Sequence, residues 1–181
     1  MIAFFLSLSL SCSQNIIRKE STMTELLPLE KSIIHTDHNG LTQEEFANLK
    51  EKTIKAKDLS YSPYSNFRVG ATILTTCGEY ISGANVENAS YGACICAERT
   101  AITRAVVSGF KSFRAIGIST DLKDKIGSPC GICRQVIREF GLNVSIYLFN
   151  VDGSKYFRVQ LKDILPLSFG PSDLGLPEHD G

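Results

Sequence analysis

From Leu41 onward, hydrophobic and polar positions alternate in patterns typical of helices and strands. A first helix is expected to begin at Thr42, because Thr42 and Glu45 have capping-box spacing while Leu41 and Phe46 are placed for a hydrophobic staple. The helix should run to about Lys57, where turn-forming residues follow. Its apolar stripe consists of Phe46, Leu49, Thr53, Ile54 and Ala56.

The rest of this region alternates β-rich and helical patterns. "FRVGATIL" and "EYISGANVE", separated by the turn-like "TTCGE", predict an antiparallel strand pair. Further strands are expected at "RAIGIST", "NVSIYLFN" and "SKYFRVQL", and helices at Cys96–Ser108, "CGICRQVIREF" and "LKDILP". The segment from Asp58 to Asn66 is expected to be a loop, and "FGPSDLGLPEHDG" an irregular tail. Together these predict an α/β fold, a three-layer α/β/α sandwich around a mixed five-stranded sheet.

A length of 181 residues suits one compact domain. We expect residues 41–174 to form it, with a dispensable or disordered N-terminal extension at 1–40 and a tail at 175–181. The apolar start "MIAFFLSLSLSCSQ" resembles a short signal-peptide core, yet no basic residue precedes it and it is too short to span a bilayer. Met23 opens a more ordinary beginning for a soluble protein. A cytoplasmic location is therefore expected, with a signal peptide as the alternative.

The charge balance argues against polyanionic partners. Nineteen basic and nineteen acidic side chains give no net charge, and no dense Lys/Arg run offers a local basic patch. Nucleic-acid binding is therefore not expected, nor is a membrane partner. A small-molecule substrate fits this composition better.

Two cysteine motifs carry the candidate chemistry. Cys96 and Glu98 are separated by one residue, and further along "SPCGICRQ" places Cys130 and Cys133 in C-x2-C spacing. A C-x-E motif followed by P-C-x-x-C is the signature of zinc-dependent deaminases in their three-cysteine form. Each half of the motif is weak alone, but the combination is specific.

The spacing also makes chemical sense. Three thiolates at two helix N-termini would hold Zn²⁺ and leave a fourth tetrahedral position for water, and the positive helix ends favour ionised sulfur. Glu98, which is not itself a ligand, can act as a proton shuttle. Arg99 is placed to offset the negative charge of the thiolates.

Plainer interpretations stay open for the same residues. Cys94 could join the other three cysteines in a closed structural site of four thiolates. Glu98 and Arg99 could belong to an ordinary solvated helix face. Cys77 and Cys94 are otherwise expected to be inert small residues.

The motifs, in this order, resemble those of cytidine deaminases of the small, homotetrameric, zinc-dependent type. The resemblance runs from Thr42 to Leu174 and rests on "YSPYSNFRVGA", "GANVENASYGACICAERTAI", "SPCGICRQ" and "LPLSFGP". It implies one zinc ion per subunit on the three cysteines of the signature, with the glutamate matching Glu98 as proton shuttle. The region from Met1 to Asn39 has no counterpart in this family.

Further roles follow from the resemblance alone. Phe67 would pack on the pyrimidine ring, Asn85 and Glu87 would bind the ribose 3′-hydroxyl, and the Ala97 backbone would meet the pyrimidine edge. Asn85 and Glu87 stand at i and i+2 of an extended segment and so project to one side, although a polar strand end would look the same. The remaining expected residues are Ser128 in substrate binding, Tyr64, Tyr91 and Phe169 from neighbouring subunits, and Gln135 behind the zinc ligands. As core aromatics, Tyr64, Tyr91 and Phe169 would look the same in sequence.

The expected function is hydrolytic deamination of cytidine and 2′-deoxycytidine to the uridines, with release of ammonia, in pyrimidine salvage. A homotetramer with active sites shared between subunits is implied. One alternative is a deaminase of another small amino-heterocycle such as blasticidin S, against which the polar pair Asn85 and Glu87 argues. The others are a non-catalytic zinc-stabilised interaction module and a polynucleotide editor.

Overall fold

The first helix begins where its local sequence predicts. The computed structural model describes residues 27–28 and 41–178, and helix α2 spans Gln43–Ala56 with Thr42 as N-cap. The Glu45 amide donates to Thr42 Oγ1 at 3.1 Å, and the Thr42 amide donates to Glu45 Oε2 at 2.8 Å. Leu41 and Phe46 are both buried in one apolar cluster, as a hydrophobic staple requires.

A mixed sheet forms the middle layer of the molecule. Its main strands are β2 (Val69–Thr75), β3 (Tyr80–Ala84), β4 (Phe113–Thr120), β5 (Ser145–Phe149) and β6 (Lys155–Gln160). The pair β4 and β5 is parallel, whereas β2 runs antiparallel to both β3 and β4, and β6 antiparallel to β5. This confirms the five strands predicted and their mixed directions.

The sheet also has a short strand that the sequence did not predict. Strand β1 (Leu27–Pro28) pairs antiparallel with β6, so the order across the sheet is β1-β6-β5-β4-β2-β3. Two residues are too few to produce an alternation pattern, so this strand could not be predicted from the sequence. The expected extension at 1–40 otherwise lies outside the described residues.

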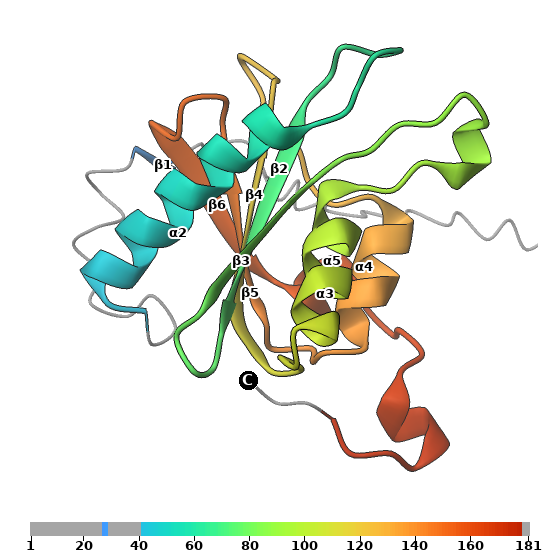
Figure 1. The fold of residues 1–181 in the computed structure, drawn as a ribbon. Coiled ribbons are helices and arrows are strands. Elements are labelled where there is room, and N and C mark those ends of the chain that lie inside the picture. Colours follow the sequence, from blue (N-terminus) through green and yellow to red (C-terminus); the bar gives the residue numbers. More distant parts are fainter. Residues whose placement is uncertain (1–26, 29–40, 179–181) are drawn as a thin grey trace, which may run out of the picture.

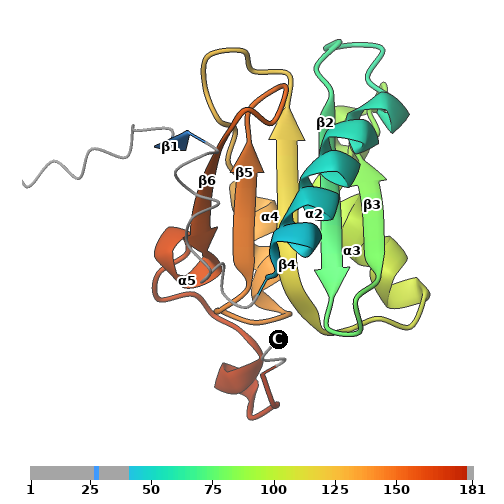
Figure 2. The ribbon, with the colours of Figure 1, turned by 90° about the vertical axis from the view of Figure 1, so that its left-hand side faces the viewer.

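Helices cover both faces of this sheet (Figures 1 and 2). Helix α2 crosses one face, whereas α3 (Ala97–Val107) and α4 (Gly131–Arg138) lie on the other. A short helix, α5 (Leu161–Ile164), follows β6. Each face has its own apolar cluster, one containing Phe46 and Phe149, the other Ile102 and Ile137. The predicted three-layer sandwich is confirmed.

Short 3-10 segments punctuate the connections. They are η1 (Lys57–Leu59), η2 (Tyr91–Ala93) and η3 (Pro171–Leu174). The segment expected to be a loop thus starts with a helical turn, and the tail expected to be irregular contains η3. In the tail, the Gly170 amide donates to Asp173 Oδ2 at 2.7 Å, a local side-chain contact that orders the turn.

Gly83 brings helix α3 directly against the sheet. A Cβ atom at Gly83 would stand 2.4 Å from the Ala101 nitrogen and 2.8 Å from the Ala97 carbonyl oxygen. A side chain at this position of β3 would push α3 outward, so glycine fixes the height of the helix and of the motif at its start. Among the described residues, every helix is too short or too polar to cross a membrane.

Candidate active site

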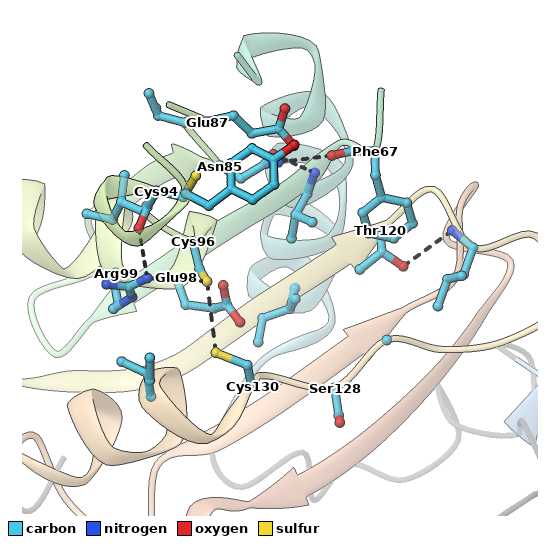
Figure 3. A pocket seen from close by; sticks show the side chains of 18 of the residues that line it. Phe67, Asn85, Glu87, Cys94, Cys96, Glu98, Arg99, Thr120, Ser128 and Cys130 are labelled. Atoms are coloured by element: carbon cyan, nitrogen blue, oxygen red, sulfur yellow. Dashed lines mark hydrogen bonds between the residues drawn. The ribbon is translucent and has the colours of Figure 1, made fainter. Parts of the chain in front are cut away.

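Three cysteine side chains meet at the N-terminal ends of α3 and α4. Cys96 is the N-cap of α3 and Cys130 the N-cap of α4, while Cys133 lies in the first turn of α4. Their Sγ atoms all lie within 4.8 Å of one another, and those of Cys96 and Cys130 are 3.9 Å apart. Figure 3 shows this pair facing each other beside Glu98.

The three sulfurs fit a tetrahedral zinc site. Zinc–thiolate bonds are about 2.3 Å long, which for tetrahedral angles corresponds to sulfur–sulfur separations of about 3.8 Å. The distance of 3.9 Å between Cys96 and Cys130 matches this value, and the other pairs need only a small adjustment. Three soft donors are also the chemistry that zinc prefers.

Arg99 and the neighbouring thiol favour the ionised form of Cys96. A hydrogen bond from Cys133, supported by one from Arg99, lowers the pKa of Cys96 to about 5. The same contact with the Cys96 thiolate raises the pKa of Cys133, which is also buried. Arg99 Nη2 lies 3.5 Å from Cys96 Sγ and donates to the Cys94 carbonyl at 3.3 Å, so the expected cation is beside the sulfurs.

Glu98 is a buried carboxyl group in the first turn of α3. Only 4% of the residue is exposed, and burial raises the pKa of its side chain above the ordinary value. Figure 3 shows the carboxyl group close to Cys96 and Cys130. A carboxyl group with a raised pKa beside a metal-binding cluster suits proton transfer, and the burial of Glu98 excludes the solvated-face interpretation for this residue.

Cys94 lies apart from the three-cysteine cluster. Its sulfur accepts a hydrogen bond from the Asn88 amide at 3.3 Å. The metal-binding group found among the described residues consists of Cys96, Cys130 and Cys133. Cys77 is exposed, and its sulfur contacts Thr75 Oγ1 at 3.2 Å. The geometry thus favours an open site of three thiolates.

A cavity of about 630 Å³ opens onto the cluster. Its lining includes most of the residues expected from the sequence: Phe67, Asn85, Glu87, Tyr91, Cys96, Glu98, Arg99, Ser128 and Cys130. Ala97 and Cys133 are fully buried and contribute no lining surface. The volume is appropriate for a small molecule with several polar groups.

Asn85 uses its amide to hold the wall of this cavity. Its Oδ1 accepts hydrogen bonds from the Val69 amide at 2.8 Å and from Ser60 Oγ at 2.6 Å. Its Nδ2 donates to the Phe67 carbonyl at 2.9 Å. An amide nitrogen carries two hydrogens, so one donor is left for a ligand.

Glu87 is held by the loop that precedes Phe67. Its Oε2 accepts from the amides of Tyr64, at 2.9 Å, and Ser65, at 3.2 Å, and its Oε1 accepts from the Ser65 hydroxyl. These hydrogen bonds, with that of the Ser65 hydroxyl the strongest, lower the pKa of Glu87. The cavity therefore has an ionised carboxylate at this end.

The remaining expected residues are spread more widely. Tyr64 and Tyr91 contact each other edge to face, with ring centroids 6.2 Å apart, beside a second cavity of about 340 Å³. Ser128 Oγ accepts a hydrogen bond from Arg134 at 3.1 Å. Gln135 donates to the Phe169 carbonyl at 3.0 Å, and neither residue lines the main cavity.

Several lining residues were missed by the sequence analysis. These are Val69, Val86, Gly92, Cys94, Ile95, Ile118, Thr120, Leu122, Gly127 and Ile132. Val69 and Thr120 are register partners in neighbouring strands, and they face the cavity because it lies at that end of the sheet. Their apolar or small side chains resemble those of ordinary strand residues. Only their position at strand ends could have indicated that they line a cavity.

Three thiols at two helix ends with a buried carboxyl group define a metal-dependent hydrolytic site of the deaminase class. Residues 43–149 match the family model described as the cytidine and deoxycytidylate deaminase zinc-binding region. The chain belongs to this zinc-binding family.

Relatives and solved structures agree with this assignment. The chain is 43% identical over 134 residues to a probable cytidine deaminase of Dictyostelium discoideum, covering 74% of this chain and 90% of that protein. It is 40% identical to a cytidine deaminase of Halalkalibacterium halodurans, covering 70% and 95%. Its fold resembles the crystal structure of cytidine deaminase from Burkholderia pseudomallei, with a TM-score of 0.65, 39% identity, and coverage of 71% and 100%.

Proposed function

We propose that this protein hydrolyses cytidine and 2′-deoxycytidine to the corresponding uridines with release of ammonia, a reaction of pyrimidine salvage. The observation that carries the proposal is the buried carboxyl group of Glu98 beside three convergent thiols at the base of a nucleoside-sized cavity. The family assignment and the names of the relatives support the same reaction.

Cys96, Cys130 and Cys133 would hold one zinc ion per subunit. Bound zinc supplies Lewis acidity, which makes water a nucleophile near neutral pH. Arg99, beside the Cys96 sulfur, offsets part of the negative charge of the thiolates and so preserves that acidity. Gln135 is proposed to support this region from α4, although its observed contact is with Phe169.

Glu98 would move the protons of the reaction. It accepts a proton from the water that attacks C4 and delivers it to N3 of the ring. It then transfers the second proton of that water to the amino group, so that the C4–N bond breaks, the C4 carbonyl forms and ammonia leaves. Burial raises its pKa above the ordinary value, which favours uptake of a proton by this carboxyl group, as a shuttle requires.

The walls of the cavity would orient the nucleoside. Phe67 would pack on the pyrimidine ring, and Ser128 would meet the polar edge of the base. The Ala97 backbone, also expected at that edge, is fully buried in this structure, so its contact requires a local adjustment when substrate binds. The remaining N–H of Asn85 and the carboxylate of Glu87 bind the 3′-hydroxyl of the ribose. A hydrogen-bonding pair of this kind favours a nucleoside over an amino-heterocycle that lacks the sugar.

A homotetramer with shared active sites is part of the proposal. Tyr91, Phe169 and Tyr64 are 74%, 61% and 48% exposed in the single subunit. Large aromatic groups at such exposure are typical of interface residues. We propose that they complete the active sites of neighbouring subunits.

We also propose a cellular location and the boundaries of the catalytic domain. Thiol ligands persist most readily in a reducing compartment, which favours the cytoplasm. We assign the catalytic domain to residues 41–174, followed by a short tail at 175–181. The extension at 1–40 adds strand β1 to the sheet and is otherwise assigned as dispensable.

One assay tests the proposed reaction directly. Purified, zinc-loaded protein should convert cytidine to uridine, measured as the change in ultraviolet absorbance and as ammonia released, and Glu98→Gln protein serves as the matched control. Blasticidin S and a cytosine-containing oligonucleotide are assayed alongside. Preference for either of these would assign a different deaminase, and no turnover of any substrate by zinc-loaded protein would favour a structural zinc module.

A further inference from the structure

The substrate cavity is bordered by two segments that lie just beyond the paired part of the sheet. Val69 begins β2 and is the register partner of Thr120, which ends β4. Phe67 and Arg68 precede this pair on one strand, and Asp121 and Leu122 follow it on the other. Phe67, Val69, Thr120 and Leu122 all line the cavity. The separation of its two walls therefore depends on what joins the segments where the ladder stops.

Asp121 provides this connection with its side chain. Asp121 Oδ2 accepts the backbone amide of Arg68 at 3.1 Å and Arg68 Nε at 2.9 Å, and Oδ1 accepts Arg68 Nη2 at 3.2 Å. Val69 and Thr120 are the last paired residues of β2 and β4 at this end of the sheet. Continuing their antiparallel register by one residue places Arg68 opposite Asp121. The carboxylate thus extends the ladder by one step, and because one of its bonds is to the backbone it fixes the main chain next to Phe67.

The buried side chain of Lys57 also contacts the Asp121 carboxylate. Lys57, only 4% exposed, donates from Nζ to the Val151 carbonyl at 2.7 Å, contacts the Thr120 carbonyl at 3.4 Å, and lies 3.6 Å from Asp121 Oδ1. The Lys57 backbone packs closely against Gly70 of β2. A Cβ atom at Gly70 would stand only 2.7 Å from the Lys57 nitrogen. The Asp121 side chain thereby connects the end of β4, Lys57 at the end of α2, and the loop before β2.

We propose that Asp121 is a positioning residue that sets the distance between the two walls of the substrate cavity and so tunes the fit of the pyrimidine between them. This inference rests on the proposed function for the identity of the ligand. Asp121 does not line the cavity, so it acts through Phe67 and Thr120 and not on the reacting atoms.

The test compares two carboxylates that bind the same arginine. Asp58 Oδ1 accepts Arg68 Nη1 at 3.1 Å, but in the described contacts it holds the guanidinium and not the backbone. Asp58→Asn is therefore the matched control for Asp121→Asn. We expect Asp121→Asn to raise KM for cytidine about tenfold and Asp121→Ala by more, with kcat within about threefold of the wild type, because packing on the base is shared by ground and transition states. Asp58→Asn should change KM less than about twofold, as expected for an exposed ion pair.

Inhibition by the product separates positioning from damage to the catalytic centre. Uridine retains the ring and the ribose, so its inhibition constant should rise by the same factor as KM in the Asp121 variants. Zinc content and melting temperature are measured in parallel. If Asp121→Ala fails to fold, the nearly isosteric Asp121→Asn decides the question.

The outcomes distinguish this inference from the proposed function. If the wild type does not turn over cytidine, the proposed function fails, and equilibrium binding of uridine to wild type and variants then decides the inference. Weaker uridine binding in Asp121→Asn but not in Asp58→Asn supports it. It is overturned by equal effects of the two variants, by a loss of kcat at constant KM, by wild-type behaviour of Asp121→Asn, or by a wild type that does not bind uridine.

Discussion

The sulfur atoms of Cys96 and Cys130 lie 3.9 Å apart although the residues are 34 positions apart in sequence and cap two different helices. The contact exists because α3 and α4 cover the same face of the sheet and both begin at its same end. Helix packing thus assembles a set of thiols that neither helix could present alone, and integrity of the site should depend on each of them.

Substitution of single cysteines tests the ligand set. Cys96→Ser, Cys130→Ser and Cys133→Ser should each lose zinc or fold poorly, because removal of one ligand opens a three-thiolate site. Cys94→Ser should retain one zinc per subunit, since its sulfur contacts Asn88 and not the cluster. Zinc is measured by elemental analysis of the purified proteins. Equal loss in all four variants would support a closed site of four thiolates.

Glu98→Ala tests the proton path. The variant should keep its zinc, fold and oligomeric state while turnover falls by about 10²- to 10⁴-fold, the range for a general acid–base group. Steady-state rates on cytidine give the effect, with zinc content and circular dichroism as controls. Activity above roughly a tenth of the wild type lies outside that range and would remove Glu98 from this role.

A substrate series tests the ribose contacts. Free cytosine should be a very poor substrate, because binding energy from the sugar helps to position the base. Cytidine and 2′-deoxycytidine should both react, whereas a cytosine oligonucleotide should be rejected by the carboxylate of Glu87. The values of kcat/KM for these four compounds are compared in wild type and Glu87→Gln. Efficient turnover of the oligonucleotide would overturn the free-nucleoside assignment.

Truncation at Met23 tests the N-terminal extension. A protein beginning at Met23 should be soluble, tetrameric and fully active, since the match to the deaminase family begins only at residue 43. It retains Leu27–Pro28, which pair with β6. A protein beginning at Leu41 is the informative comparison, because it also removes β1. Activity and size-exclusion elution are measured for both, and a large loss on truncation at Met23 would contradict the dispensable extension.

Features of this protein that depend on neighbours in sequence could be predicted well. Thr42 and Glu45 are three residues apart, and their capping box fixes the start of α2 from local hydrogen bonds. The same holds for Cys96 and Glu98, whose spacing already implies a ligand and a shuttle at one helix start. The β-rich, nearly continuous apolar segments also identified the five main strands of the sheet.

Contacts between distant segments could not be predicted in this way. Asp121 and Arg68 are 53 residues apart and meet only because β2 and β4 are antiparallel neighbours in a particular register. The cavity lining by Thr120 and Leu122 depends on the same register. Cys94 lies outside the cluster, and its sulfur contacts Asn88 in the segment before α3. This contact could not be predicted from the spacing of the cysteines.

The Ser65 hydroxyl links two groups proposed to hold opposite parts of the nucleoside. It donates to Glu87 Oε1 and accepts the Phe67 amide at 3.0 Å. Substitution at Glu87 should therefore disturb Phe67 as well, so the free-energy costs of Glu87→Gln and Phe67→Ala for uridine binding should not add. A double-mutant cycle measures this coupling, and strict additivity would mean that the sugar and base contacts are energetically independent. Coupling through this hydroxyl would make recognition of the ribose and of the ring a single cooperative event.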